Sequence, residues 1–304
     1  MDKMRQGVVL FITLSVIVAM MALVGVIFAY LEKSKDDASY TSSLIQADLL
    51  FRDTKDAISA LLKKSGEDKE TRRAVLDMLY LAPVTIQAEE SDAYATIFCQ
   101  PLDNGVNINW LGLENNSSTY GLYDTAQTIF DQLVDQYDIQ NGSLLLSKIL
   151  YAIDPENLPP SDHQSRLEQK KGIISLSQMH GIVREYRFEA DDAAVESIPW
   201  ESYFTFGMES DIIDGNYISA KLISLLFEME LPTVEEEWIE GESLKEFITD
   251  QGGDISRYND KLFTEEIVER MRCLVNYGYQ GRSYAFGFDY LEGRAEQFEF
   301  YGKQ

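Results

Sequence analysis

The longest uniform pattern in the sequence is an uncharged run from Val8 to Leu31, which holds 24 residues without Asp, Glu, Lys or Arg. As an α-helix it would extend about 36 Å, whereas the hydrocarbon core of a bilayer is about 30 Å thick. The apolar part of a cleaved secretory signal is only about 7 to 15 residues long. The pattern therefore predicts a single membrane-spanning helix over residues 8–31.

Beyond this segment, apolar residues recur at intervals of three and four with charged residues between them, which predicts an amphipathic helix. No Pro or Gly occurs between Tyr30 and Lys64. One helix can therefore run from Val8 to Lys64, over about 85 Å. The residues expected on its apolar face are Leu44, Ile45, Leu49, Leu50, Ile58, Leu61 and Leu62.

The remainder of the chain combines strand and helix patterns. An alternating stretch from Thr85 to Leu111 is interrupted at Asn104-Gly105, a dipeptide that tolerates positive φ, and predicts a β-hairpin with its turn there. A second hairpin is predicted from Arg282 to Tyr301, with Glu292-Gly293 at its turn. Helical periodicity dominates residues 120–231, between the two hairpins. These patterns predict an α+β fold with its helices in the centre.

Composition narrows the classes of partner. The 304 residues include 26 basic and 51 acidic ones, for a net charge of −25, and 45% are hydrophobic. This is enough apolar material for a large core. Binding a polyanion requires a cluster of Lys and Arg, so we expect no nucleic-acid partner.

Enzyme signatures are absent from the sequence. His163 and His180 are the only histidines. There is no nucleophile elbow, no zinc-binding His-Glu-x-x-His and no phosphate-binding glycine loop. Runs of acids such as Asp191-Asp192 and Glu235-Glu236-Glu237 are expected from composition alone in a chain with 51 acids. We therefore predict that the chain is not an enzyme.

A short polar leader, Met1 to Gln6, ends at Gly7, and the apolar run starts immediately at Val8. This arrangement resembles the leader of a type IV prepilin. The resemblance implies that a membrane-embedded prepilin peptidase cleaves after Gly7 and that Val8, as the first mature residue, is methylated.

Ile12 occupies the fifth mature position, where most pilins and pseudopilins carry Glu. A carboxylate inside a bilayer costs about 3 kcal/mol or more and is kept only where a partner offsets the cost. In pilins that partner is thought to be the N-terminal amine of the subunit ahead. Ile12 therefore indicates either a protein outside this class or a subunit with nothing ahead of it.

Four later segments resemble, in the same order, elements of pseudopilin K of type II secretion. The resemblance implies a small pilin-like α/β head with a large helical insertion. The sequence departs from the family at Tyr151, Asp214 and Ile218. The four segments are Asp103 to Asn109, the helices that lead to Asp154, Ile173 to Gly181, and Asp214 to Ser219 with the helix after it.

The resemblance and the patterns together divide the chain into six segments. They are a leader (1–7), a transmembrane helix (8–31), a periplasmic continuation of the stalk helix (32–64), the first part of the head (65–119), a mainly helical insertion (120–231) and the remainder of the head (232–304).

The expected location is the bacterial inner membrane, crossed once. Basic residues near the two ends of the apolar run are balanced, so positive charge specifies the orientation only weakly. A short N-terminal tail is nevertheless unlikely to keep the whole remaining chain from crossing, which places the N-terminus in the cytoplasm and the C-terminal domain in the periplasm. Other minor pseudopilins and the prepilin peptidase are the implied partners.

Calcium is the cofactor that the resemblance implies, because pseudopilin K is a calcium-binding family. The candidate ligands are Asp154, Glu156 and Asp162, which are closely spaced acids around a proline-containing segment. Calcium binds six to eight oxygen ligands, and such a loop can bring several of them together. The alternative is a simple helix exit, with Asp154 and Pro155 forming a turn.

Cys99 and Cys273 are the only cysteines and would both lie in the oxidising periplasm. We predict that they pair. The bond would close a loop of about 174 residues and add about 5 kcal/mol of stability on the chain-entropy account. The alternative is a pair of buried thiols that act as small apolar residues.

The functional prediction is a minor pseudopilin that initiates and caps a pseudopilus and so supports protein export. A minor pilin of a type IV pilus or a DNA-uptake system is an alternative of the same class. An alternative of another class is a signal-anchored periplasmic enzyme or sensor domain.

Overall fold

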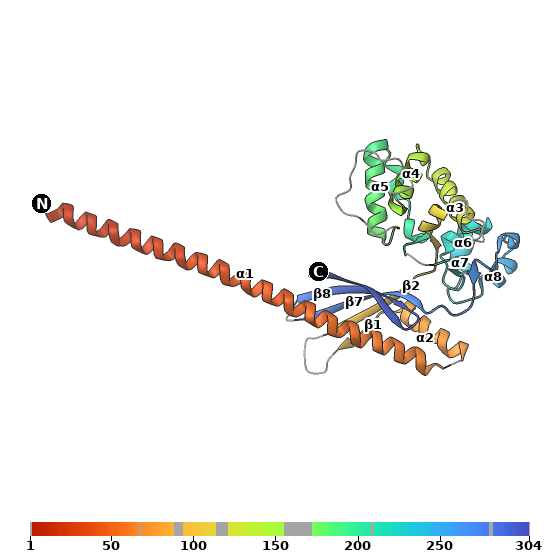
Figure 1. Cartoon of the computed structure of the whole chain (residues 1–304), viewed down its shortest axis with the longest axis horizontal. Helices are drawn as coiled ribbons and strands as arrows, with labels where there is room; N and C mark the ends of the chain where they lie inside the picture. The colour runs from red at the N-terminus through yellow and green to blue at the C-terminus, as the bar shows by residue number, and fades with distance from the viewer. Residues whose placement is uncertain are drawn as a thin grey trace.

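The computed structural model describes residues 2–66, 68–87, 94–113, 121–154, 172–207, 210–279 and 282–303. A single helix, α1 (Asp2–Lys64), projects far beyond a head that contains a β-sheet and a separate group of helices (Figure 1). The α+β class and the long N-terminal helix are as predicted. The helix also ends at the predicted residue, Lys64, but it begins at Asp2, so residues 2–7 continue it.

The main sheet is antiparallel and has the strand order β1-β2-β7-β8-β9. Its central pair joins β2 to β7, although the whole helical part of the chain lies between these strands in sequence. The strands are β1 (Val84–Gln87), β2 (Tyr94–Pro101), β7 (Arg270–Tyr279), β8 (Arg282–Leu291) and β9 (Arg294–Lys303).

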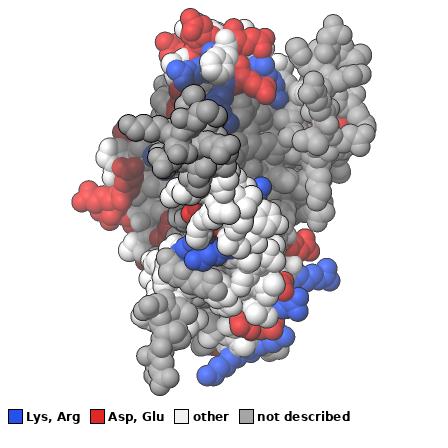
Figure 2. Space-filling view, turned by 90° about the vertical axis from the view of Figure 1, so that its left-hand side faces the viewer, with Lys and Arg blue, Asp and Glu red and all other residues white. Residues whose placement is uncertain are grey.

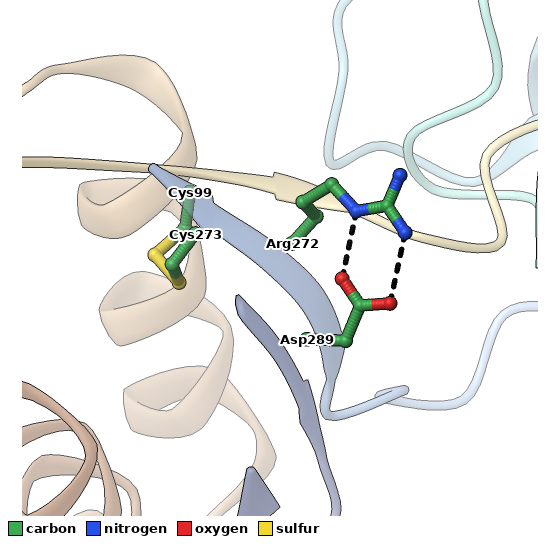
Figure 3. Close-up of a disulfide and its surroundings, with 4 residues drawn as sticks. All are labelled: Cys99, Arg272, Cys273 and Asp289. Carbon is green, nitrogen blue, oxygen red and sulfur yellow. Dashed lines mark hydrogen bonds and ion pairs between the residues drawn. A yellow bond between two sulfur atoms is a disulfide. The ribbon is translucent and has the colours of Figure 1, made fainter. Parts of the chain in front are cut away.

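Cys99 and Cys273 lie directly opposite each other on β2 and β7 and are joined by a disulfide with an S–S distance of 1.98 Å. Both cysteines are fully buried. Successive side chains of a strand point to opposite faces, and Arg272 accordingly lies on the other face of the sheet. There its guanidinium donates two hydrogen bonds to Asp289, at 2.7 and 2.9 Å (Figure 3).

The C-terminal half of α1 packs on one face of the sheet (Figure 1). The ring of Phe51 meets that of Phe288 edge to face at 5.1 Å. The hydroxyl of Tyr277 donates a 2.6 Å hydrogen bond to the backbone oxygen of Ser43. A second helix, α2 (Lys69–Leu81), is capped by Asp68, whose carboxylate accepts from the N–H of Thr71, and it adds Leu76 and Leu79 to the same core.

The helical part forms a second core of its own, centred on the fully buried side chains of Phe130, Tyr186, Trp200, Phe204 and Phe227. Its helices are α3 (Leu122–Gln136), α4 (Gly142–Ile153), α5 (Leu176–Ala190), α6 (Ala220–Phe227), α7 (Leu231–Glu237) and α8 (Leu244–Asp250). Short 3₁₀ helices connect them: η1 (Ile108–Leu113), η3 (Ala194–Ser197), η4 (Trp200–Ser202) and η5 (Ile255–Arg257).

Local sequence explains where these helices begin. Asn141, Ser175 and Ser219 each stand one residue before a helix, and each accepts a hydrogen bond from a backbone N–H of the first turn. Such caps satisfy donors that have no partner within the helix. Helix α6 follows the Asp214 to Ser219 element as expected.

The helical part includes more of the chain than the predicted residues 120–231. Its core runs from Val106 to Phe263 and includes Val234 of α7 and Leu244 of α8. Short segments, residues 228–230 and 238–243, connect α6 to α7 and α7 to α8, and Met229 and Trp238 within them pack against the same core.

The hairpin predicted at Asn104-Gly105 is wrong. Its first strand exists within β2, but the chain then leaves the sheet, and β3 (Val106–Asn107) pairs in parallel with β4 (Phe204–Thr205). Gly105 allows the backbone to pass close to that of Tyr203, since a Cβ at this position would lie 3.1 Å from the backbone oxygen of Tyr203. It does not form a hairpin turn. A similar parallel pair joins β5 (Ile213–Asp214) to β6 (Phe263–Thr264).

The closing hairpin is confirmed. β8 and β9 are joined by Glu292 and Gly293, with φ angles of 50° and 92°. Two successive residues with positive φ are typical of a tight hairpin turn whose twist matches that of the strands.

Replacing both cysteines, Cys99→Ala with Cys273→Ala, should lower the free energy of unfolding by about 2–5 kcal/mol, because the open chain regains the entropy of a very long loop. Thermal unfolding of the full chain in detergent without reductant measures the change. Reductant should destabilise the parent protein and leave the double variant unchanged. Two reactive thiols in the unreduced, denatured parent would contradict the bond.

Candidate functional site

The predicted processing residues Gly7, Val8 and Ile12 all lie within the continuous backbone of α1. Their side chains are outside the described part of the structure. Among the apolar residues that follow, Leu14 and those from Val16 to Leu31 have described side chains, and these are exposed, as at Met21 (72%). Within the described residues, α1 is the one helix long and apolar enough to cross a membrane.

The second half of α1 has two different faces. The face against the sheet buries small or polar side chains first, namely Ser43, Ala47 and Thr54. Further toward the C-terminal end of the helix it buries Ile58 and Leu62. Small residues allow the helix to approach the strands closely. The larger apolar residues expected to form the buried face therefore divide between the two sides of the helix.

Four of the residues predicted on the apolar face are exposed instead, and one of them, Leu61 (38%), lies near the end of the helix. The other three are Leu44, Ile45 and Leu49, exposed by 39%, 60% and 51%. We call these three residues the outer stripe. The mostly polar residues 32–43 separate them from the exposed apolar residues of the first half of α1. From the N-terminal side, acidic side chains gather at the left, and acidic and basic side chains lie together at the top and at the lower right (Figure 2).

A buried polar cluster joins the sheet to the helical part. Asp103, which follows β2, pairs with Arg270 at the start of β7, with a distance of 3.1 Å from Oδ2 to Nε. The backbone N–H of Asp214 donates a 2.7 Å hydrogen bond to the backbone oxygen of Asp103. Asp103 and Asp214 are only 3% and 2% exposed. Two carboxylates are thus removed from water at one junction.

The partners of Asp214 extend this cluster to α2. The side-chain and backbone N–H groups of Asn216 donate to Oδ1 of Asp214 at 2.8 and 3.0 Å. Arg73 of α2 donates to Asn216 at 2.7 Å. On the same helix, Asp77 accepts a 2.6 Å hydrogen bond from the hydroxyl of Tyr217. The element that includes Asp214 and Asn216 therefore fixes the helical part against α2.

Burial dominates the electrostatics of this cluster. It raises the pKa of Asp214 to about 7, and the nearby Asp103 raises it further, while the hydrogen bonds from Asn216 and the charge of Arg73 oppose the shift. Burial also raises the pKa of Asp103, against the opposing effect of Arg270. Asp214 can therefore hold a proton close to neutral pH.

The other predicted element, Asp103 to Asn109, fastens loops of the helical part. Oδ1 of Asn107 accepts from the backbone and side-chain N–H groups of Asn109, both at 3.0 Å. Asn109 in turn exchanges hydrogen bonds with the backbone of Ile173 and donates to Gly207. The Asn-rich string thus has a structural role in this chain.

The predicted calcium ligands are only partly visible. Asp154 is described and forms the C-terminal cap of α4, whereas Glu156 and Asp162 lie outside the described residues. No group of three or more His, Cys, Asp or Glu side chains in the described ranges is arranged to hold a metal ion. Because two of the three candidate ligands lie outside the described residues, calcium binding stays a prediction.

The sequence reasoning missed the junction. The sequence places Asp214 in an element that resembles pseudopilin K, but nothing in the local pattern pairs that element with Arg73 or relates it to Arg270. A buried ion pair between residues so far apart leaves no signal in the local pattern of the sequence.

No protein-family model matches the sequence, and no curated protein matches it. Among solved structures, the fold is similar to a chain in the crystal structure of the GspK-GspI-GspJ complex from the enterotoxigenic Escherichia coli Type 2 Secretion System, with a TM-score of 0.52 and 12% sequence identity. The likeness covers 87% of this chain and 97% of that chain. The chain therefore shares the fold of a subunit of that complex over nearly its whole length.

Acidification should stabilise the fold. The folded-state pKa of Asp214, about 7, lies above its ordinary value of 3.8, so the folded state keeps a proton that the unfolded chain releases. This stabilisation is fully present below pH 3.8 and is lost as the pH rises to about 7. The midpoint of thermal unfolding should be higher at about pH 5.5 than at about pH 8.

The variant Asp214→Asn should flatten this dependence and stabilise the protein near pH 8, because the amide oxygen still accepts from Asn216 without a buried charge. Asp250→Asn, at the exposed end of α8, is the matched control and should keep the parent's dependence. If the unfolding midpoint of Asp214→Asn changes with pH as much as that of the parent, Asp214 is not the source of the pH effect.

Proposed function

We propose that this chain is a minor pseudopilin that helps to initiate and cap the pseudopilus of a type II secretion system. The observation that carries the proposal is the architecture that the chain shares with a subunit of the GspK-GspI-GspJ complex, over 97% of that subunit. A long helix, half exposed and apolar and half docked on a sheet, combines membrane anchorage with a folded head. We propose no catalytic role.

The proposed location is the inner membrane, with the N-terminus in the cytoplasm and the head in the periplasm. The exposed apolar half of α1 supports the single crossing. The disulfide between Cys99 and Cys273 supports the placement of the head, since such bonds persist in oxidising compartments.

The proposed partners are other minor pseudopilins, bound along α1. The outer stripe supports this, because its three apolar side chains are exposed in the isolated chain and lie on the same helix as the membrane segment. Burying an apolar side chain of this size stabilises a contact by about 1.5–3 kcal/mol. A neighbouring apolar helix would cover the membrane segment and the stripe together.

The proposed position is the tip of the filament. Ile12 lacks the carboxylate with which a pilin helix is thought to engage the amine of the subunit ahead, and a tip subunit has no such neighbour. The helical part adds bulk on the side of the head away from the N-terminus, where a further subunit would have to be placed (Figure 1). After cleavage, the amine of Val8 is free to receive the glutamate of the next subunit below.

Coexpression with a prepilin peptidase should yield a mature chain that begins at Val8, as intact mass spectrometry would show. Gly7→Val should block cleavage, because a branched side chain then stands beside the scissile bond. Gly25→Ala is the matched control, since a Cβ at that position meets nothing within 4 Å. A mature parent chain that still begins at Met1 or Asp2 would refute processing.

The double variant Ile45→Ser with Leu49→Ser should weaken copurification with other minor pseudopilins at least about tenfold, because two buried apolar contacts are lost. The thermal stability of the isolated chain should hardly change, since both side chains are exposed there. Asp53→Ser, a charged exposed position on the same helix, is the control. Undiminished association of the double variant would exclude the outer stripe as a contact surface.

A further inference from the structure

A hollow of about 370 Å³ lies on the helical part, between α5 and the segment that holds η3 and η4. Ser177, His180 and Arg184 line one side of it and recur along one face of α5 at intervals of three and four. This volume is at the lower end of the range for small ligand sites, about 300–1,000 Å³. The remaining lining residues are Val183, Glu196, Ile198 and Trp200.

The floor of the hollow is apolar. Val183, Ile198 and Trp200 are at most 4% exposed. The indole Nε1–H of Trp200 is buried and donates to no acceptor in the described part of the chain.

The rim carries a cation that is not neutralised. Arg184 is exposed and forms no ion pair with any described residue. Glu196, the one carboxylate of the hollow, already accepts two hydrogen bonds from Arg187 of the next helical turn, at 2.7 and 2.8 Å. The remaining polar groups, Ser177 and His180, can both donate. Because Glu196 is already paired with Arg187, Arg184 leaves a positive charge at the rim, and this charge favours an anionic group.

We infer that this hollow binds a carboxylate attached to an apolar group, as at the C-terminus of a polypeptide that ends in an apolar residue. The guanidinium of Arg184 would bind the carboxylate at the rim, since this planar cation matches carboxylate geometry. The apolar group would lie on Val183, Ile198 and Trp200. The rim is open, because Ser177, His180 and Arg184 border solvent, so the rest of the polypeptide can extend away from the surface.

The test uses the full chain in detergent micelles, labelled with ¹⁵N at tryptophan. The three indole N–H signals can be told apart by their partners: Trp110 donates to Ser210, Trp238 donates to Ile218, and Trp200 is unpaired. N-acetyl-phenylalanine should shift the Trp200 signal in a saturable way and leave the other two in place. The probe's amide, which has the same shape without the charge, should bind at least about tenfold more weakly.

Arg184→Gln should weaken binding of the acid to the level of the amide, and Arg184→Lys should restore part of it. Arg294→Gln, an exposed arginine of the β8–β9 hairpin, is the matched control. The unliganded Trp200 signal reports whether each variant keeps its fold. The inference is overturned if the acid leaves the Trp200 signal unmoved, if acid and amide bind equally, or if Arg184→Gln binds like the parent. None of these outcomes bears on the proposed pseudopilin role.

Discussion

The pairing of β2 with β7 is the contact on which the rest of the architecture depends. These neighbouring strands enclose the whole helical part in sequence, and they are held in register over seven residue pairs and by the disulfide at Cys99 and Cys273. The entropy of closing a loop grows only slowly with its length, so a large insertion costs little more than a moderate one once the strands are paired. The helical part can therefore be large without disturbing the sheet that supports the stalk helix.

The stalk helix and the junction follow from this frame. Tyr277 and Phe288 of the sheet contact α1. The helix packs there through small and polar residues, and its outer stripe stays exposed. At the other side, Arg270 begins β7 and meets Asp103, which directly follows the end of β2, so the ion pair stands where the insertion leaves and rejoins the sheet. The same strand pair thus positions both the anchor and the helical part.

The sequence predicted the elements that local chemistry specifies. The end of α1 at Lys64 was predictable from the periodicity of the helix's own residues, and the turn at Glu292-Gly293 from two adjacent residues. The turn predicted at Asn104-Gly105 is wrong, because Gly105 instead lies against the backbone of Tyr203, a residue far away in the sequence. The apolar face of α1 was only partly right, because a period of three to four cannot say which of two faces meets the sheet. The hollow at Arg184 and Trp200 and the junction at Asp214 depend on tertiary proximity and had no local pattern.

The central claim is that this chain is a terminal subunit, anchored by α1 and bearing a head that no further subunit covers. The most direct measurement is electron microscopy of assembled pseudopili in which the C-terminus of this chain carries a gold-binding tag. The account predicts label at one end of each filament and none along its length. Label distributed along the filaments would contradict it.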